Sequence, residues 1–483
     1  MAVSQHWPSG FVGSLAKWGI IAGVNSDVSS HASKGVVLLV ATMASFLFPF
    51  MGSAVNIALP SIGKELSLDA VTLGWVSTAY LLASATVLVP FGRIADLHGR
   101  KRIFTYGIAV YTVSSFLSGV AGSAATLIFF RVLQGVGGAM LAGTAVAIIT
   151  SVFSADERGK ALGINVAATY TGLSLGPVLG GVLTQHFGWR SIFIINVPVG
   201  LAVMAITLWK LKGEWAGARG EKFDLVGSAI YSLTLVTLVY GFILLPALSA
   251  VWLIVAGVVG LFSFARWEMR VRNPVLDMNL FRENRGFTFS NLAALINYSA
   301  TYAVAFLMSL YLQYVKGFEP QAAGFILVTM PAVQAIFSPL AGRLSDRIEP
   351  RVIASAGMAL TTAGLVPFIL LDGETPLECI IGALILIGLG FAFFSSPNTN
   401  AVMSSASKKD YGVASATLAT MRQVGMVFSM GVAMLMFALY IGRVQITPEH
   451  YSLFLESMKT SFTVFAVLCF GGIFASLARG KIR

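Results

Sequence analysis

Charged residues are scarce in this sequence: they make up 11% of its 483 residues, whereas 56% are hydrophobic. A soluble globular protein has about 25% charged residues, because its surface has to be wetted by water. The composition therefore excludes a soluble globular protein and indicates a chain that lies in a membrane. The 49 glycines fit this interpretation, since small residues let membrane helices approach each other closely.

Groups that carry enzyme chemistry are also rare. Cys379 and Cys469 are the two cysteines, and both lie in apolar stretches, so we expect small core residues without a disulfide or a metal site. A Walker loop is absent, and the longest polar loops, near 211–222 and 267–286, are too short for a soluble domain. The sequence thus predicts no enzyme, no cofactor and no ATP-driven pump, although a receptor or an enzyme without transport remains an alternative.

Long apolar runs dominate the rest of the chain. A helix crosses a bilayer with roughly 20 mostly apolar residues, and fourteen such runs are present. They predict an all-α integral membrane protein with fourteen transmembrane helices. The runs lie near 35–59, 70–91, 103–122, 125–149, 161–184, 190–210, 223–245, 248–266, 287–314, 321–341, 352–371, 376–400, 411–438 and 459–478.

The basic residues are distributed asymmetrically between these runs. With the N-terminus inside, 25 of the 32 Lys and Arg fall in cytoplasmic segments and five outside, while Arg131 and Arg422 lie within helices. This is the positive-inside bias. It predicts a multi-pass plasma-membrane protein with both termini in the cytoplasm, and it explains the net charge of +11 without nucleic acid. Residues 1–34 are expected to form a poorly ordered cytoplasmic tail, or to reflect a misplaced start codon.

Two similar loops indicate an internal repeat. Residues 92–102 (GRIADLHGRKR) and 342–351 (GRLSDRIEPR) lie 250 positions apart, and each follows a predicted helix. If each loop follows the second helix of a six-helix unit, two helices remain between the units. We therefore expect an N-terminal bundle at 35–212, two inserted helices at 223–266 and a C-terminal bundle at 287–478, with the substrate site between the bundles near mid-membrane.

The loop 92–102 resembles the signature loop of the major facilitator superfamily. Residues 131–139 (RVLQGVGGA) and 172–181 (GLSLGPVLGG) are similar to that family's fourth-helix and antiporter fifth-helix motifs, and 56–60 (NIALP) and 422–425 (RQVG) resemble motifs of its fourteen-helix drug/proton antiporter branch. The resemblance covers about 35–478. It implies the major facilitator fold of two six-helix bundles plus two inserted helices. It also implies a monomeric, secondary-active exporter of amphipathic small organic molecules, drugs or metabolites, that works by alternating access.

The resemblance also implies a gate at the signature loop. Asp96 stands among basic residues, so its carboxylate can pair with one of them or cap a neighbouring helix, and Asp346 occupies the second copy of the loop. The alternative is that the basic cluster only sets topology. The expected gate residues are Gly92, Arg93, Asp96, Gly99, Arg100, Lys101 and Asp346, with Asp156, Glu157, Arg158 and Lys160 of the next loop as candidate partners.

The fifth predicted helix carries a repeated glycine. Gly172, Gly176 and Gly180 recur every four residues and share one helix face, which predicts a small-residue seam against another helix. Pro177 adds a kink, and Gly181 extends the seam. The resemblance implies that this seam prevents leakage and favours export; packing alone is the alternative.

Two arginines are predicted to lie inside the membrane. A charge there costs at least about 2.5 kcal/mol, so Arg131 and Arg422 are functional candidates, although each could instead bind backbone carbonyls and lock two helices. Gln134, Gln423 and Asn56 are expected beside them as coupling or cavity groups. Further candidate substrate contacts, each more often an interhelical hydrogen bond, are Tyr80, Asn165, Tyr170, Asn297, Tyr298, Tyr302, Gln334 and Asn398.

Acidic residues are missing from the middle of every predicted helix. The fourteen-helix branch typically has an acid five positions before the Asn of its Asn-x-Ala-Leu-Pro motif, and here that position is Met51. Proton coupling needs a group that titrates, which arginine does not do usefully. Protons remain a candidate coupling ion, but a uniporter or anion exchanger with a cationic cavity is the alternative. Small-molecule substrate, anionic or neutral, and lipid are the expected partners.

Overall fold

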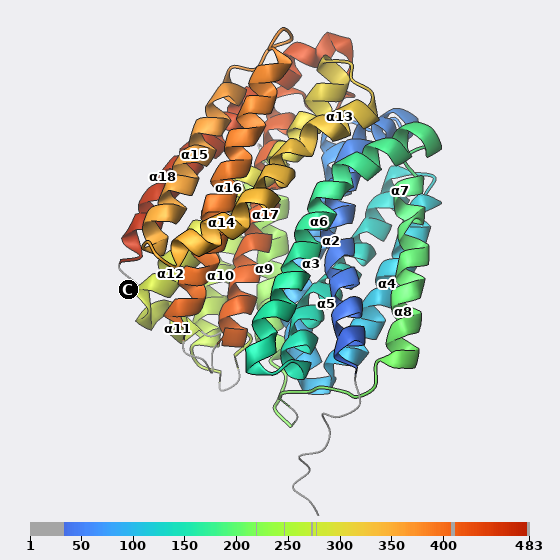
Figure 1. The fold of residues 1–483 in the computed structure, drawn as a ribbon. Coiled ribbons are helices and arrows are strands. Elements are labelled where there is room, and N and C mark those ends of the chain that lie inside the picture. The colour runs from blue at the N-terminus through green and yellow to red at the C-terminus, as the bar shows by residue number, and fades with distance from the viewer. Residues whose placement is uncertain are drawn as a thin grey trace, which may run out of the picture.

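The computed structural model describes residues 33–218, 220–245, 247–271, 274–276, 278–406 and 411–480. The expected tail at 1–34 lies outside these residues apart from its last two positions. In the described part of the chain the structure is all helical, without a strand, and forms an elongated bundle (Figure 1). The first half contains α2 (Lys34–Glu65), α3 (Ala70–His98), α4 (Arg100–Gly119), α5 (Ala124–Val152), α6 (Ala155–Phe187), α7 (Ser191–Ile194) and α8 (Asn196–Lys210). The remainder contains α9 (Leu225–Leu244), α10 (Leu248–Glu268), α11 (Met278–Glu283), α12 (Arg285–Leu310), η2 (Tyr311–Val315), α13 (Pro320–Leu327), α14 (Thr329–Ser345), α15 (Pro350–Ile369), α16 (Leu377–Ser405), α17 (Tyr411–Tyr440), η4 (Pro448–His450) and α18 (Tyr451–Ala478).

Thirteen spans within the described residues are long and apolar enough to cross a membrane. The fourteenth predicted helix is α4, whose 20 residues are enough to cross the hydrocarbon core. Three consecutive basic residues and several Ser and Thr lower its hydropathy. The all-α membrane architecture expected from the sequence is therefore confirmed.

Several helices extend beyond their apolar runs. The sequence predicted a helix at 161–184, but α6 begins at Ala155, and Asp156 and Glu157 occupy its first turn, where carboxylates favour the helix dipole. Likewise, α18 begins at Tyr451 instead of 459, after the short η4 turn. Apolar runs mark only the part of a helix that lies in hydrocarbon, so polar first turns were missed.

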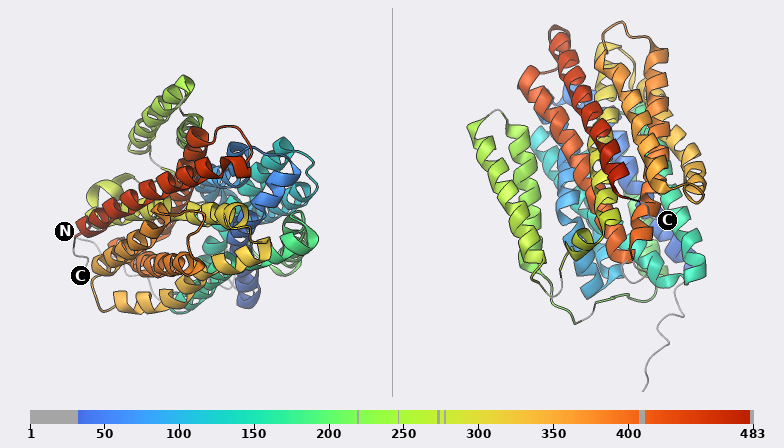
Figure 2. Two further views of the ribbon diagram at one scale, coloured as in Figure 1. Left: turned by 90° about the horizontal axis from the view of Figure 1, so that it is seen from above. Right: turned by 90° about the vertical axis from the view of Figure 1, so that its left-hand side faces the viewer.

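The helices pack within two groups. In the first, α2 lies along α6, and α5 lies between α3 and α4; in the second, α16 packs on α14 and α15, and α12 on α17. The inserted helices α9 and α10 pair with each other, and α9 contacts α3 and α17. Figure 2 shows this pair at the outer edge of the bundle. We call α2–α8 the first half and α12–α18 the second half.

Most of the hydrogen bonds between the two halves lie at one end of the bundle. We call the end where α2 begins and α18 finishes the proximal end, and the opposite end the distal end. Hydrogen bonds between the halves cluster distally, where α13 leans against α6 (Figure 1). They comprise Ser309 Oγ to Asn56 O (2.7 Å), Gln313 Nε2 to Ile57 O (3.0 Å), Ala70 N to Val444 O (3.0 Å), Thr78 Oγ1 to Met434 Sδ (3.0 Å), His186 Nε2 with Gln321 Oε1 (2.9 Å) and Gln321 N to Gln185 Oε1 (3.1 Å).

Toward the proximal end the halves separate. At mid-depth, two long hydrogen bonds of 3.5 Å join the described residues of the two halves, Tyr170 OH with Ser395 Oγ and Gln423 Nε2 with Ser84 Oγ. Closer to the proximal end, no hydrogen bond between the halves occurs among the described residues. Among the described residues, hydrogen bonds between the halves are therefore concentrated at the distal end.

Candidate functional site

The signature loop lies at the proximal end, where α3 meets α4. Its residues 92–98 form the last turns of α3, Gly99 is the junction, and 100–102 begin α4. Asp96 Oδ1 accepts a hydrogen bond from Arg100 Nε at 2.8 Å. The same guanidinium donates to Ala147 O (3.0 Å) and Ser151 Oγ (2.5 Å) of α5. The carboxylate expected to pair with a base thus pairs with Arg100, and this pair fastens the loop to α5.

The segment between α8 and α9 packs on the signature loop, a contact that was not predicted from the sequence. The linker segment, residues 211–218 and 220–224, joins α8 to α9. Its backbone pairs with the loop, through Arg100 N to Trp215 O at 2.8 Å and Ala218 N to Asp96 O at 3.0 Å. Gly99 lies between these contacts with φ of +121°, a conformation that favours glycine.

Two carboxylates of the linker segment complete the attachment. Glu214 Oε1 accepts a hydrogen bond from Lys101 N at 2.8 Å, which caps the first turn of α4, and Glu214 Oε2 lies 4.0 Å from Arg102 Nε. Glu221 Oε2 pairs with Arg93 Nη2 at 2.5 Å. The basic residues of the loop are therefore held by the linker segment, in addition to any role in topology.

The partners expected from the next loop were wrong. Glu157 pairs with Lys34 at 2.5 Å, and Arg158 Nη2 donates to Thr150 O at 3.0 Å. Asp156, Glu157, Arg158 and Lys160 all belong to the first turns of α6. None of them pairs with the signature loop in the described structure.

Two further gate residues, Gly92 and Asp346, lie near helix ends. Gly92 was expected in the signature loop, but it lies inside α3, and a side chain there would meet nothing within 4 Å. Asp346 directly follows α14, at the position that corresponds to Asp96 in the first loop.

The glycines of α6 lie where the sequence predicted a seam. A Cβ at Gly172 would collide with Phe46 O, one at Gly176 with Ser53 Oγ, and one at Gly180 would lie 2.8 Å from Ala54 Cα. All three of these neighbours belong to α2. A close α2–α6 contact therefore depends on these positions having no side chain.

The neighbouring Gly181 and Pro177 face the other half instead. A Cβ at Gly181 would lie 2.5 Å from Pro320 O of α13, and Gly324 of α13 meets Pro177 O. The segment 172–181 thus contacts α2 with one face and α13 with another. Its second face forms part of the distal closure.

Arg131 is fully buried in the first half. Its Nε donates to Val76 O (2.9 Å), its Nη1 to Gln134 Oε1 (2.5 Å), and its guanidinium carbon lies 4.1 Å from the ring centroid of Tyr80. Gln134 Nε2 in turn donates to Ser115 Oγ at 2.6 Å. Among the described residues no carboxylate pairs with Arg131, and its Nη2 has no hydrogen-bond partner. A cation–π contact and a helix-to-helix lock hold this charge.

Arg422 has a different environment, at mid-depth between the halves. It is half-buried, and its Nη2 donates to Thr399 Oγ1 of α16 at 2.6 Å. Its guanidinium carbon lies 5.6 Å from the centroid of the Tyr298 ring. Its Nε has no hydrogen-bond partner in the described structure. A half-exposed cation with an unused donor is suited to receive an anionic group.

Aromatic and hydroxyl groups surround this arginine. The Tyr298 ring meets Phe391 edge-on at 5.0 Å, and Tyr170 OH lies 3.5 Å from Ser395 Oγ. Phe391, Ser395 and Thr399 recur every four residues and share one face of α16. We call Tyr170, Tyr298, Phe391, Ser395, Thr399 and Arg422 the Arg422 cluster. Tyr170 comes from the first half and the other members come from the second, so the cluster bridges the halves.

Three members of this cluster, Tyr170, Tyr298 and Arg422, were predicted from the sequence. Phe391, Ser395 and Thr399 were not. Their spacing along one helix face was a usable signal, but an apolar run hid it.

Five of the amide side chains predicted from the sequence share a different property. Each is buried and has at least one side-chain N or O atom without a hydrogen-bond partner among the described residues. These are Asn165, Asn297, Gln334, Asn398 and Gln423. Unpaired buried amides are costly unless water or a ligand satisfies them.

Other candidates occupy structural positions. Asn56 belongs to the distal closure, where its Oδ1 accepts from Ser77 Oγ at 3.0 Å. Tyr80 OH donates to Phe48 O at 3.1 Å, beneath Arg131. Tyr302 of α12 places its hydroxyl near Gly52 of α2.

The position of the missing acid is enclosed. Met51 is fully buried in the apolar core. In the described helices the acidic residues lie within the first or last two turns, and no group of three metal-ligating side chains was found in that part of the chain. Of the two cysteines, Cys469 is buried as expected, but Cys379 is exposed on the first turn of α16, so the core interpretation was wrong for it.

Comparisons with known proteins agree with this architecture. The model of the Major Facilitator Superfamily matches residues 41–430 and 290–482. The riboflavin transporter RibZ of Clostridioides difficile is 31% identical over 91% of this chain and 96% of its own length. The puromycin resistance protein pur8 of Streptomyces alboniger is 33% identical over 83% of this chain and 80% of its own length. The multidrug resistance protein Stp of Mycobacterium tuberculosis is 32% identical over 81% of this chain and 73% of its own length.

A similar fold is known from crystal structures. A bacterial homologue of the human lysosomal transporter Spinster, in an inward-facing and unoccupied conformation, has a TM-score of 0.69 at 18% sequence identity. The alignment covers 92% of this chain and 97% of that one.

Proposed function

Because this chain belongs to the Major Facilitator Superfamily, we propose that it is an exporter that moves small amphipathic organic molecules by alternating access. The chain is a multi-pass membrane transporter and not an enzyme. The proposal adds the direction of transport, the class of substrate and the mechanism. Drug-resistance and export proteins among its relatives support the direction.

The Arg422 cluster is the observation that carries the proposal. It combines a cation, two phenol rings, a phenyl ring and two hydroxyls at mid-depth, with contributions from both halves. Aromatic faces bind the apolar part of a molecule, and the guanidinium binds its polar or acidic part. A site shared by two halves changes its access when the halves rock against each other.

The orientation follows from the charges. The basic signature loop and its repeat both lie at the proximal end, so the positive-inside bias assigns that end to the cytoplasm. Both termini are then cytoplasmic, and we assign the protein to the plasma membrane. We propose that this conformation, in which the hydrogen bonds between the halves gather at the distal end, is the one that opens to the cytoplasm.

Coupling to protons is the step for which the structure offers least support. Met51 is buried where the related branch places a carboxylate, and no carboxylate lies at mid-depth among the described residues. This observation favours the second candidate function, a uniporter or anion exchanger in which Arg422 binds the acid group of the substrate. Proton antiport is the default of the family branch that the chain resembles.

Efflux from reconstituted vesicles distinguishes these functions. Liposomes that contain the wild-type protein are loaded with candidate aromatic substrates, and efflux is followed with and without a pH gradient. An antiporter is accelerated by the gradient, whereas a uniporter is not. Binding without flux for every compound tested would contradict the proposal that this chain exports such molecules.

A further inference from the structure

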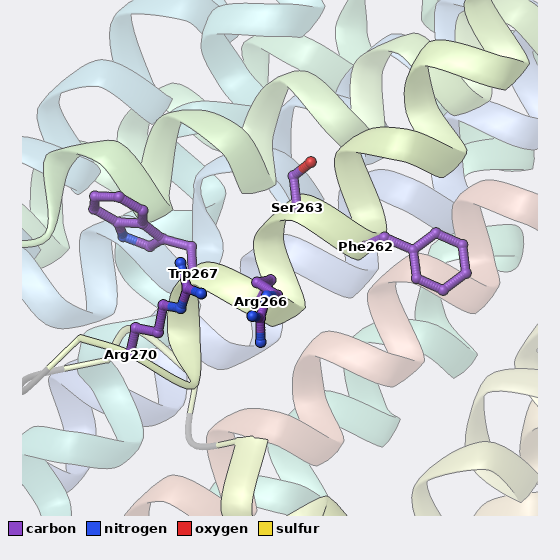
Figure 3. A pocket seen from close by; sticks show the side chains of 5 residues that line it. All are labelled: Phe262, Ser263, Arg266, Trp267 and Arg270. Atoms are coloured by element: carbon purple, nitrogen blue, oxygen red, sulfur yellow. The ribbon is translucent and has the colours of Figure 1, made fainter.

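The outer face of α10 forms a groove at the proximal end of the inserted pair. Phe262, Ser263, Arg266, Trp267 and Arg270 line it, and its volume is about 410 Å³ (Figure 3). The groove lies outside both halves and apart from the Arg422 cluster. Nothing in the proposed transport cycle uses it.

Helix α10 is the most exposed of the membrane spans. Only 17% of its most apolar 18-residue window is buried in the protein, whereas the next lowest share is 28%, for α6. Trp252, Val255, Val259 and Phe262 are all exposed along it. Within a bilayer these side chains face acyl chains, so an apolar track leads from mid-membrane into the groove.

The groove itself is positively charged. Arg266 belongs to the last turn of α10, Arg270 to the turn that follows Glu268, and both line the groove. Both are exposed, and neither forms an ion pair with any described residue. Two guanidiniums that have no ion-pair partner in the described part of the chain, at the end of a membrane span, are placed at the depth of lipid phosphates.

Two carboxylates lie near the groove in the described part of the chain, and neither forms an ion pair with Arg266 or Arg270. Glu268 is 3% exposed and accepts a hydrogen bond from Leu276 N at 3.0 Å. Asp224 caps α9 through Gly227 N (2.8 Å) and accepts from Trp267 Nε1 (3.0 Å). The bond to Asp224 fixes the indole as one wall of the groove, and neither carboxylate neutralises the two arginines.

We propose that this groove binds one anionic phospholipid, whose phosphodiester lies between Arg266 and Arg270. Its acyl chains follow the apolar track of α10, and Trp267 lies at the headgroup level, where tryptophan is favoured. The proximal position places the site in the cytoplasmic leaflet, whose anionic lipids attract basic residues. The bound lipid would anchor the inserted pair beside the linker segment that holds the signature loop.

Native mass spectrometry of the full-length protein tests the proposal. Detergent-purified protein is mixed with dioleoylphosphatidylglycerol or with dioleoylphosphatidylcholine, which carries the same acyl chains without net charge. We expect one phosphatidylglycerol to be retained selectively, and the R266Q/R270Q variant to retain about tenfold less. The R266K/R270K variant keeps both charges and should retain most of the binding.

A matched variant controls for net charge. K210Q/K212Q removes two exposed cations at the same end, Lys210 as the last residue of α8 and Lys212 at the start of the linker segment, and should retain phosphatidylglycerol as the wild type does. Equal retention of the two lipids, equal retention by wild type and R266Q/R270Q, or displacement of the lipid by millimolar inorganic phosphate would each overturn the proposal.

Discussion

Replacing Arg422 with Gln separates the two parts of a substrate that the Arg422 cluster would bind. The glutamine keeps a neutral polar side chain, but it removes the charge, the unused Nε donor and the Nη2 group that donates to Thr399. A hydrogen bond to a charged group contributes about 1.5–3 kcal/mol, and each 1.4 kcal/mol is a factor of ten in affinity. For an acidic substrate, we therefore expect the KM of the variant to rise by about 10- to 150-fold.

The assay compares an aromatic carboxylate with its methyl ester in the same vesicles. The ester retains the ring system that Tyr298 and Phe391 would contact, but it has no charge for Arg422. Its transport by the variant should change by less than about threefold, because only neutral hydrogen bonding is altered. Equal losses for acid and ester would refute the reasoning, since they would indicate that Arg422 supports the fold and does not bind the substrate's acid group.

Three further substitutions test other parts of the structure. Gly176→Leu would overlap Ser53 of α2 and should destabilise the protein by at least about 1–3 kcal/mol, measured as a lower melting temperature in detergent. The control is Gly163→Leu, on the same helix but facing open space. An equal shift in melting temperature for the two variants would contradict the seam. Glu214→Ala removes the cap of α4 and should cost about 1 kcal/mol, whereas Gln at this position should retain most of the stability; equal shifts would argue against capping. Asp96→Asn weakens the pair with Arg100, so vesicle flux should slow while expression stays normal, and unchanged flux would count against a gate.

The features that follow from local spacing could be predicted from the sequence. Apolar runs of the right length identified the membrane spans, and the four-residue recurrence of Gly172, Gly176 and Gly180 identified a close helix contact that α2 provides. The arrangement of Lys and Arg also predicted which loops would share one end. These features depend on residues that are near one another in the chain, or on the bilayer as a common solvent.

Contacts between distant segments could not be predicted in this way. Nothing in the composition of residues 211–222 indicates that Glu214 and Glu221 hold a loop more than a hundred positions earlier. Burial was similarly hidden: Arg131 and Arg422 both lie in apolar runs, yet the first is fully buried and the second is half-buried. Their difference depends on which face each helix turns toward its neighbours.

The distal closure also limits how strongly this conformation is preferred. A neutral hydrogen bond contributes about 0.5–1.5 kcal/mol net, so the few bonds that join the halves hold this state by an amount comparable with a ligand's preference for one state over another. Ser309 and Gln313 donate to the main-chain carbonyls of Asn56 and Ile57. Side-chain changes on α2 would leave those acceptors in place. These two donors, on α12 and η2, are therefore among the groups that set the balance between the two populations, which makes them natural positions at which to bias the transporter toward either state.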